Sequence, residues 1–196
     1  EGRWYRYPQL LAGALRQRMR QADPSAGGPG VAGCHRRASA WYEGQGMALE
    51  ALAHAIAASD LERAAVIAER SWQAMDRSFQ SGAWLEWVRL LPEALIRARP
   101  VLSVQRASAL IDGGELEAGE QSLLDAECLL AAMSGADPAS IPVVAVEQLA
   151  TLPARIATSR AYIAQARGDV VTTAAQAERA LSLLPEAEQD LRAQAM

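Results

Sequence analysis

The chain of 196 residues can form one large or two small domains, and 51% hydrophobic with 21% charged residues is typical of soluble globular proteins. All 19 basic residues are arginine, so a Walker-type phosphate loop and a Schiff-base enzyme are excluded, because both need a lysine amine. The net charge of −4 argues against nucleic-acid binding by the chain as a whole, although residues 1–40 carry an excess of arginine.

Helical periodicity, interrupted by glycine and proline, runs along the chain. An amphipathic helix is predicted within residues 4–20, and turn-forming residues from 22 to 30 follow it as a linker. The later predicted helices cover residues 31–43, 47–58, 61–79, 84–91, 101–111, 115–133, 143–152, 153–167, 170–184 and 185–195, with a turn from 92 to 99. No segment alternates like a strand, and the connections are short, so we predict an all-α fold of stacked antiparallel helix hairpins.

Two of these hairpins share the signature of a tetratricopeptide unit. Gly168-Asp169 is followed by the closing run Ala180-Leu181-Ser182-Leu183-Leu184-Pro185, and Ala126 follows Gly114 at the same offset of twelve as Ala180 follows Gly168. In such a unit the small residue lies where two helices cross closely. We therefore predict a tetratricopeptide-like superhelix, with one unit longer than the usual period of about 34 residues.

The sequence predicts no catalytic, cofactor or metal site. His35 and His54 lie on separate predicted helices without further ligands around them, which favours structural roles. Cys34 precedes His35, but neighbours on a helix point apart by roughly 100°, so they do not form a nucleophile–base pair. Cys34 and Cys128 are expected to be reduced, half-buried thiols.

Two other clusters have a structural and a functional interpretation. Trp84 and Trp87 are expected to pack in the core, and a docking surface is the alternative. Arg16, Arg18 and Arg20 are expected to form a solvated helix face, and contact with a nucleotide-binding module is the alternative. No pattern identifies a ligand-binding residue.

The order of several segments resembles a known family. The run Trp4-Tyr5-Arg6-Tyr7-Pro8-Gln9-Leu10-Leu11 resembles the end of the winged-helix part of maltose-regulator-like proteins, which are large ATP-dependent LuxR-type transcription regulators. Three later segments resemble their helical arm and the entry into their sensor: residues 35–42, 45–65 and 87–102. The resemblance covers about residues 4–130. The family often has histidine where Pro8 or Gln9 stands and leucine where Cys34 stands.

The resemblance implies a division into four parts. Residues 1–22 would end a winged-helix domain, 23–30 would be a linker, 31–100 a helical arm, and 101–196 the first units of a tetratricopeptide-like sensor. The chain opens without methionine and stops in a helical pattern, so we expect a piece of a longer bacterial, cytoplasmic protein. ATP or ADP would bind upstream of it, and DNA would bind to a helix-turn-helix downstream.

The function implied is that of a regulatory sensor. It would bind a small-molecule inducer or a regulatory protein and control oligomerisation and promoter binding by domains elsewhere. We expect the chain itself to be no enzyme, to hold no cofactor, to contact neither nucleic acid nor membrane directly, and to be open to self-association. A freestanding tetratricopeptide-like adaptor for protein interactions is the alternative.

Overall fold

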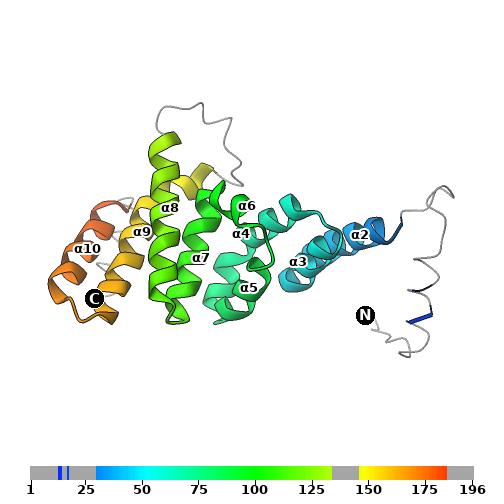
Figure 1. The fold of residues 1–196 in the computed structure, drawn as a ribbon, viewed down its shortest axis with the longest axis horizontal. Coiled ribbons are helices and arrows are strands. Elements are labelled where there is room, and N and C mark those ends of the chain that lie inside the picture. The colour runs from blue at the N-terminus through cyan, green and yellow to red at the C-terminus, as the bar shows by residue number, and fades with distance from the viewer. Residues whose placement is uncertain (1–12, 15–16, 18–29, 134–145, 185–196) are drawn as a thin grey trace. The chain divides into compact units, whose positions relative to one another are not determined.

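The computed structural model describes residues 13–14, 17, 30–133 and 146–184, and these ranges contain helices and no strand (Figure 1). This confirms the predicted all-α fold. The helices are α2 (Gly30–Gly44), α3 (Ala48–Ala57), α4 (Leu61–Arg77), α5 (Ser81–Val88), α6 (Glu93–Arg97), α7 (Pro100–Asp112), α8 (Leu116–Met133), α9 (Val146–Ala166) and α10 (Val170–Ser182). Apart from residues 13, 14, 17 and 30, the expected winged-helix end and linker lie outside the described residues, as does the helix predicted over 185–195.

The chain divides into two compact units, Glu1–Leu61 and Glu62–Met196. The expected four-part division stays a prediction. In the first unit α2 and α3 pack as a hairpin, and the buried Ser39 hydroxyl donates a hydrogen bond to the carbonyl of Ala51 at 2.8 Å. Gly46, with φ of 72°, lies in the turn between the two helices, where a left-handed backbone favours glycine.

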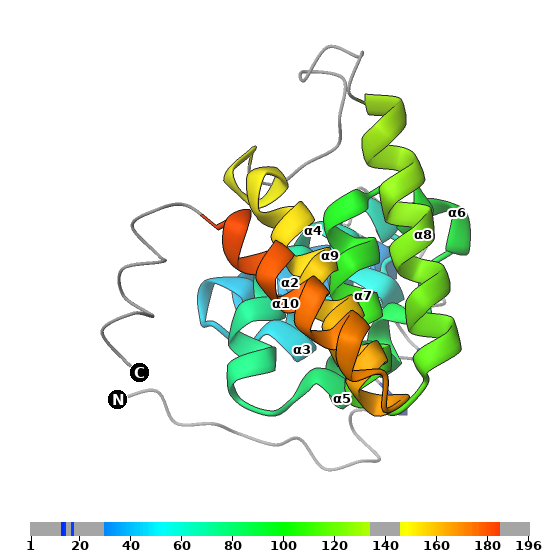
Figure 2. The same ribbon diagram turned by 90° about the vertical axis from the view of Figure 1, so that its left-hand side faces the viewer.

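The second unit is a stack of helix hairpins. α7 packs on α8, α9 packs on α10, and α7 and α8 both contact α9, so that successive hairpins lie side by side (Figures 1 and 2). Their shared core consists of the buried side chains Val101, Val104, Ala107, Leu123, Ala126, Leu152, Ile156 and Ile163. Each hairpin buries its apolar face against the next, as expected for a helical-repeat architecture.

The features predicted for the hairpin turns and crossings are present. Gly114 and Gly168 have φ of 82° and 76° and form the turns before α8 and α10. The Asp169 carboxylate caps α10 by accepting a hydrogen bond from the Thr172 amide at 3.0 Å. Ala126 and Ala180 are buried, with 0% and 7% of their surfaces exposed, as expected for small residues at helix crossings.

The crossing of α7 and α8 depends on a glycine that the sequence did not single out. A Cβ atom added to Gly119 would lie 2.7 Å from Cγ1 of Ile111 on α7. Real Cβ atoms essentially never approach another atom so closely. The two helices can therefore lie this close together only because residue 119 has no side chain. Gly119 therefore sets the spacing of this hairpin.

Two polar clusters hold α4 to α5 and to α7. The buried Trp84 packs edge-on against Trp72, and its indole Nε1 donates to the carbonyl of Ala68 at 3.1 Å. The core position of Trp84 confirms the structural interpretation; Trp87 is half-buried. Arg99, which precedes α7, donates from Nε and Nη2 to both carboxylate oxygens of Glu69 at 2.9 and 2.8 Å. The hydrogen bonds that Arg99 donates to Glu69 raise the pKa of Arg99, so the guanidinium stays charged inside the fold.

One helix break predicted from the sequence is wrong. Separate helices were expected over 143–152 and 153–167, but α9 continues through Pro153. A proline inside a helix removes one hydrogen bond and costs about 3 kcal/mol. Leu152 and Ile156 lie in the core on either side of the exposed Pro153. Burial of the helix on both sides therefore offsets the cost of the proline.

Candidate functional site

A groove runs across the first helix of each hairpin in the second unit. Its volume is about 550 Å³, and its walls come from α4, α7 and α9. The residues that line it are Trp72, Gln73, Asp76, Ser108, Ile111, Asp112, Thr151, Ala154, Arg155, Thr158, Ser159, Tyr162 and Leu184. Most of these side chains are polar, so the groove differs from the apolar interfaces that hold the helices together.

Each wall contributes one charged side chain: Asp76 from α4, Asp112 from α7 and Arg155 from α9. Burial raises the pKa of the Asp112 carboxyl, and the charge of Asp76 raises it further. Burial lowers the pKa of Arg155, and the attraction of Asp76 opposes that shift. Asp76 therefore lies within electrostatic reach of both other charges.

Within the part of the chain that the structure describes, none of these three side chains forms an ion pair. Six other arginines of the same unit do: Arg89, Arg97, Arg99, Arg106, Arg160 and Arg167. Arg155 is half-buried, and desolvation of such a charge without a partner costs free energy, whereas Asp76 and Asp112 are exposed. The groove is thus a concave place where charges of both signs are left without partners.

The hydroxyl groups of the groove present oxygen lone pairs. Ser108 donates its hydroxyl hydrogen to the carbonyl of Val104 at 3.2 Å, Thr151 to that of Gln148 at 3.0 Å, and Thr158 to that of Ala154 at 3.0 Å. A hydroxyl that has donated its hydrogen still accepts on its oxygen. The carboxylates and these hydroxyls make most of the polar wall an acceptor surface.

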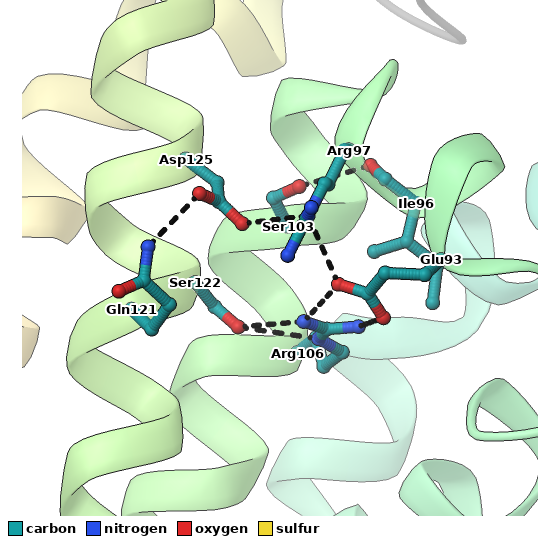
Figure 3. Close-up of polar contacts among 8 residues, drawn as sticks. All are labelled: Glu93, Ile96, Arg97, Ser103, Arg106, Gln121, Ser122 and Asp125. Carbon is teal, nitrogen blue, oxygen red and sulfur yellow. Dashed lines mark hydrogen bonds and ion pairs between the residues drawn. The ribbon is translucent and has the colours of Figure 1, made fainter.

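A second polar cluster lies between α6, α7 and α8, and each of its four charged side chains forms an ion pair (Figure 3). Arg106 donates to both carboxylate oxygens of Glu93 at 2.7 and 2.9 Å and to the Ser122 hydroxyl at 3.0 Å. Arg97 forms ion pairs with Glu93 at 3.3 Å and Asp125 at 3.0 Å. The hydrogen bonds from Arg106 hold the pKa of Glu93 below its usual value. This cluster joins three helices and has a structural role.

The structure brings together two histidines that the sequence placed on separate helices. Nδ1 of His35 lies 2.7 Å from Nδ1 of His54, and the ring of Tyr42 stacks on His54 with centroids 5.3 Å apart. Burial lowers the pKa of His54, and the charge of His35 lowers it further. This contact between α2 and α3 was not predicted, because it depends on how the two helices form a hairpin.

The other candidates from the sequence form no reactive constellation among the described residues. Cys34 is half-buried and lies 3.7 Å from Nη2 of Arg37, while Cys128 is exposed rather than half-buried. Both thiols are free. In the described ranges no three histidine, cysteine or acidic side chains gather as a metal site would require. Arg16, Arg18 and Arg20 lie outside the described residues.

Comparison with known proteins gives a similarity over part of the chain. No family profile matches the chain, and no solved structure matches it. The chain is similar to part of the serine/threonine-protein kinase PknK. The identity is 34% over 110 residues, which are 55% of this chain and 10% of PknK, for the proteins of Mycobacterium tuberculosis (strains CDC 1551 / Oshkosh and H37Rv) and of Mycobacterium bovis. The matched segment is thus about a tenth of the length of these relatives.

No described helix combines the length and the apolar character needed to cross a membrane.

Proposed function

We propose that the chain is a sensing segment of a large regulator and that it binds an inducer or a regulatory protein in the groove between α4, α7 and α9. The observation that carries this proposal is the set of unpaired charges in the groove, Asp76, Asp112 and Arg155. Similarity to a small part of the much longer PknK supports a role inside a multidomain protein. The ordered resemblance to LuxR-type, maltose-regulator-like proteins supports a role in regulation.

The arrangement of the groove suggests how binding would be transmitted. The three charges come from three successive hairpins, so one ligand that contacts all of them would fix the spacing between the hairpins. A ligand shifts a conformational equilibrium only by its difference in affinity for the two states. The curvature of a stack of helix pairs depends on small rotations between repeats. Two different curvatures would be the two states.

The output would lie outside this chain. By resemblance, the sensor would control oligomerisation and promoter binding, with ATP or ADP bound upstream and DNA bound by a C-terminal helix-turn-helix. PknK is named as a kinase, so a similar segment also occurs in a protein with a different output. The chain itself would be no enzyme and would hold no cofactor.

A groove-filling substitution tests the proposal in the full-length protein. Thr158 lies exposed in the groove on α9, so Thr158→Trp would occupy the groove without entering the core. Leu124→Trp on α8, at an exposed position outside the groove, is the matched control. We expect Thr158→Trp to reproduce the transcriptional changes of a gene deletion, and Leu124→Trp to behave as wild type. Wild-type transcript levels with Thr158→Trp would contradict the proposal.

A further inference from the structure

The charges of the groove are unbalanced toward the negative. Asp76 and Asp112 share the groove with a single cation, Arg155, which comes from α9. Nearby acids on the same unit are already neutralised: Glu115 and Glu86 bind Arg89, and Glu120 binds Arg167 at 2.8 Å. Asp76 and Asp112, by contrast, have no ion-pair partner among the described residues and are free to pair with an added cation.

The hydrogen-bonding character of the walls agrees with the charge. Ser108, Thr151 and Thr158 have given their hydroxyl hydrogens to backbone carbonyls, so they and the two carboxylates offer acceptors. A guanidinium carries five N–H donors and an ammonium three, and neither accepts a hydrogen bond. A phosphate or a carboxylate would instead meet oxygen lone pairs and two negative charges.

The groove also has donors, among them the Gln73 amide and the Tyr162 hydroxyl. Arg155 comes from α9, and the buried indole Nε1 of Trp72, at the groove's α4 wall, has no acceptor among the described residues. A ligand with a carbonyl or carboxylate oxygen beside its cation would satisfy one of these donors as well. The volume of about 550 Å³ accommodates an amino-acid derivative or a few residues of an extended peptide.

Resting on the proposed function, we infer that the groove selects a ligand carrying a guanidinium or ammonium group, and that this cation lies between Asp76 and Asp112. The cation would supply the partner that both carboxylates lack within the described fold. It would also join α4 to α7, while Arg155 on α9 holds the oxygen end of the ligand. The ligand therefore spans the three hairpins in one orientation.

Calorimetry on the full chain at about 150 mM salt tests this inference, because weak surface attraction is screened there. The probes are L-arginine amide and a blocked peptide of alternating arginine and serine, with a glutamate–serine peptide as the opposite charge. We expect at least one arginine probe to bind and the glutamate peptide not to bind. Asp76→Asn and Asp112→Asn should each weaken binding at least about tenfold. Glu178→Gln, the same loss of charge on α10 outside the groove, should leave the affinity within about twofold.

The two arginine probes distinguish the source of the cation. Equal binding of L-arginine amide indicates a free small molecule, and binding of the peptide alone indicates a segment of a partner protein; both support recognition of a cation. The inference is overturned if neither arginine probe binds at about 10 mM, if the glutamate peptide binds as well, or if both asparagine variants bind like wild type.

The result is separable from that of the groove-filling experiment. If Thr158→Trp abolishes regulation while no arginine probe binds, the groove functions but its ligand belongs to another chemical class. If arginine binds and Thr158→Trp leaves regulation intact, the site exists but the proposed regulatory role is wrong.

Discussion

Arg99 and Arg155 belong to the same helical unit, but their surroundings differ. Arg99 is 3% exposed and binds both oxygens of Glu69, which is 1% exposed. Arg155 lines an open groove with Asp76 and Asp112 and forms no ion pair within the described ranges. Charge in this unit therefore has two uses. Pairs inside the stack hold helices together, whereas the groove charges are left for something outside the fold.

The strongest test of the first use removes one member of the buried pair. Glu69→Ala leaves the guanidinium of Arg99 buried without its partner, so the free energy of unfolding should fall by about 3–5 kcal/mol. Urea unfolding measures the change. The double variant Glu69→Leu with Arg99→Met removes both charges and should recover most of the loss. A loss below about 1 kcal/mol for Glu69→Ala would mean that the pair does not hold α4 to α7.

The next largest effect is expected where the hairpins approach most closely. Gly119→Ala places a Cβ 2.7 Å from Ile111 and should destabilise the fold by about 1–3 kcal/mol through overpacking. Gly82→Ala on α5 is the matched control, because nothing lies within 4 Å of its Cβ. Alanine should stabilise that exposed helical position by about 0.5–1 kcal/mol. Thermal unfolding that shows equal shifts for both variants would contradict the close crossing of α7 and α8.

Two substitutions that each remove one negative charge, Glu93→Gln and Asp112→Asn, compare the paired cluster with the groove. The pKa of Glu93 is lowered by Arg106, so its stabilising contribution is present above its usual pKa of 4.5 and is lost as the pH falls through the lowered value. At pH 7 Glu93→Gln should therefore cost up to about 1 kcal/mol, a small effect because the side chain is half exposed.

For Asp112, in the groove, the effect of ionisation on stability has the opposite sign. The pKa of Asp112 is raised, so its ionised form disfavours the fold at pH 7. Asp112→Asn should leave the free energy of unfolding within about 0.5 kcal/mol of wild type, or slightly above it. Urea unfolding of both variants at pH 7 checks the comparison, and a larger loss for Asp112→Asn than for Glu93→Gln would contradict it.

The smallest expected effect concerns the first unit, where two bases contact each other. The pKa of His54 should lie below its usual value of 6.5, and His35→Ala should raise it in part, since burial remains. The neutral form is favoured in the fold, so this contribution to stability is lost as the pH falls from 6.5 through the lowered pKa. A titration followed by NMR of the imidazole protons measures both values. An unchanged midpoint in His35→Ala would show that His35 does not act on His54.

Much of the fold follows from the sequence because helix periods, glycine turns and small crossing residues are local signals. Gly114, Gly168, Ala126 and Ala180 have the positions that the tetratricopeptide pattern predicts. The break predicted at Pro153 is absent, because burial on both sides outweighs this local helix breaker. That outcome depends on tertiary contacts, which a local pattern does not contain.

The groove could not be predicted in the same way. Asp76, Asp112 and Arg155 are far apart in the sequence, and each one alone has the pattern of an ordinary solvated residue near a helix end or on a helix face. They share a site because α4, α7 and α9 together form the walls of one groove. Gly119 and Glu69 did leave signals, namely a glycine inside a helix and an acid among the apolar residues of α4.

The central claim is that the groove, and not the paired cluster, is where this unit meets its ligand. Chemical-shift mapping by NMR on the full chain, with the arginine–serine peptide as the probe, tests it most directly. The claim predicts that backbone amides at Asp76, Asp112 and Thr158 shift in proportion to the peptide bound, and that those at Glu93 and Asp125 stay in place. Shifts centred on Glu93 and Asp125, or no shift at Asp76 and Asp112, would contradict it.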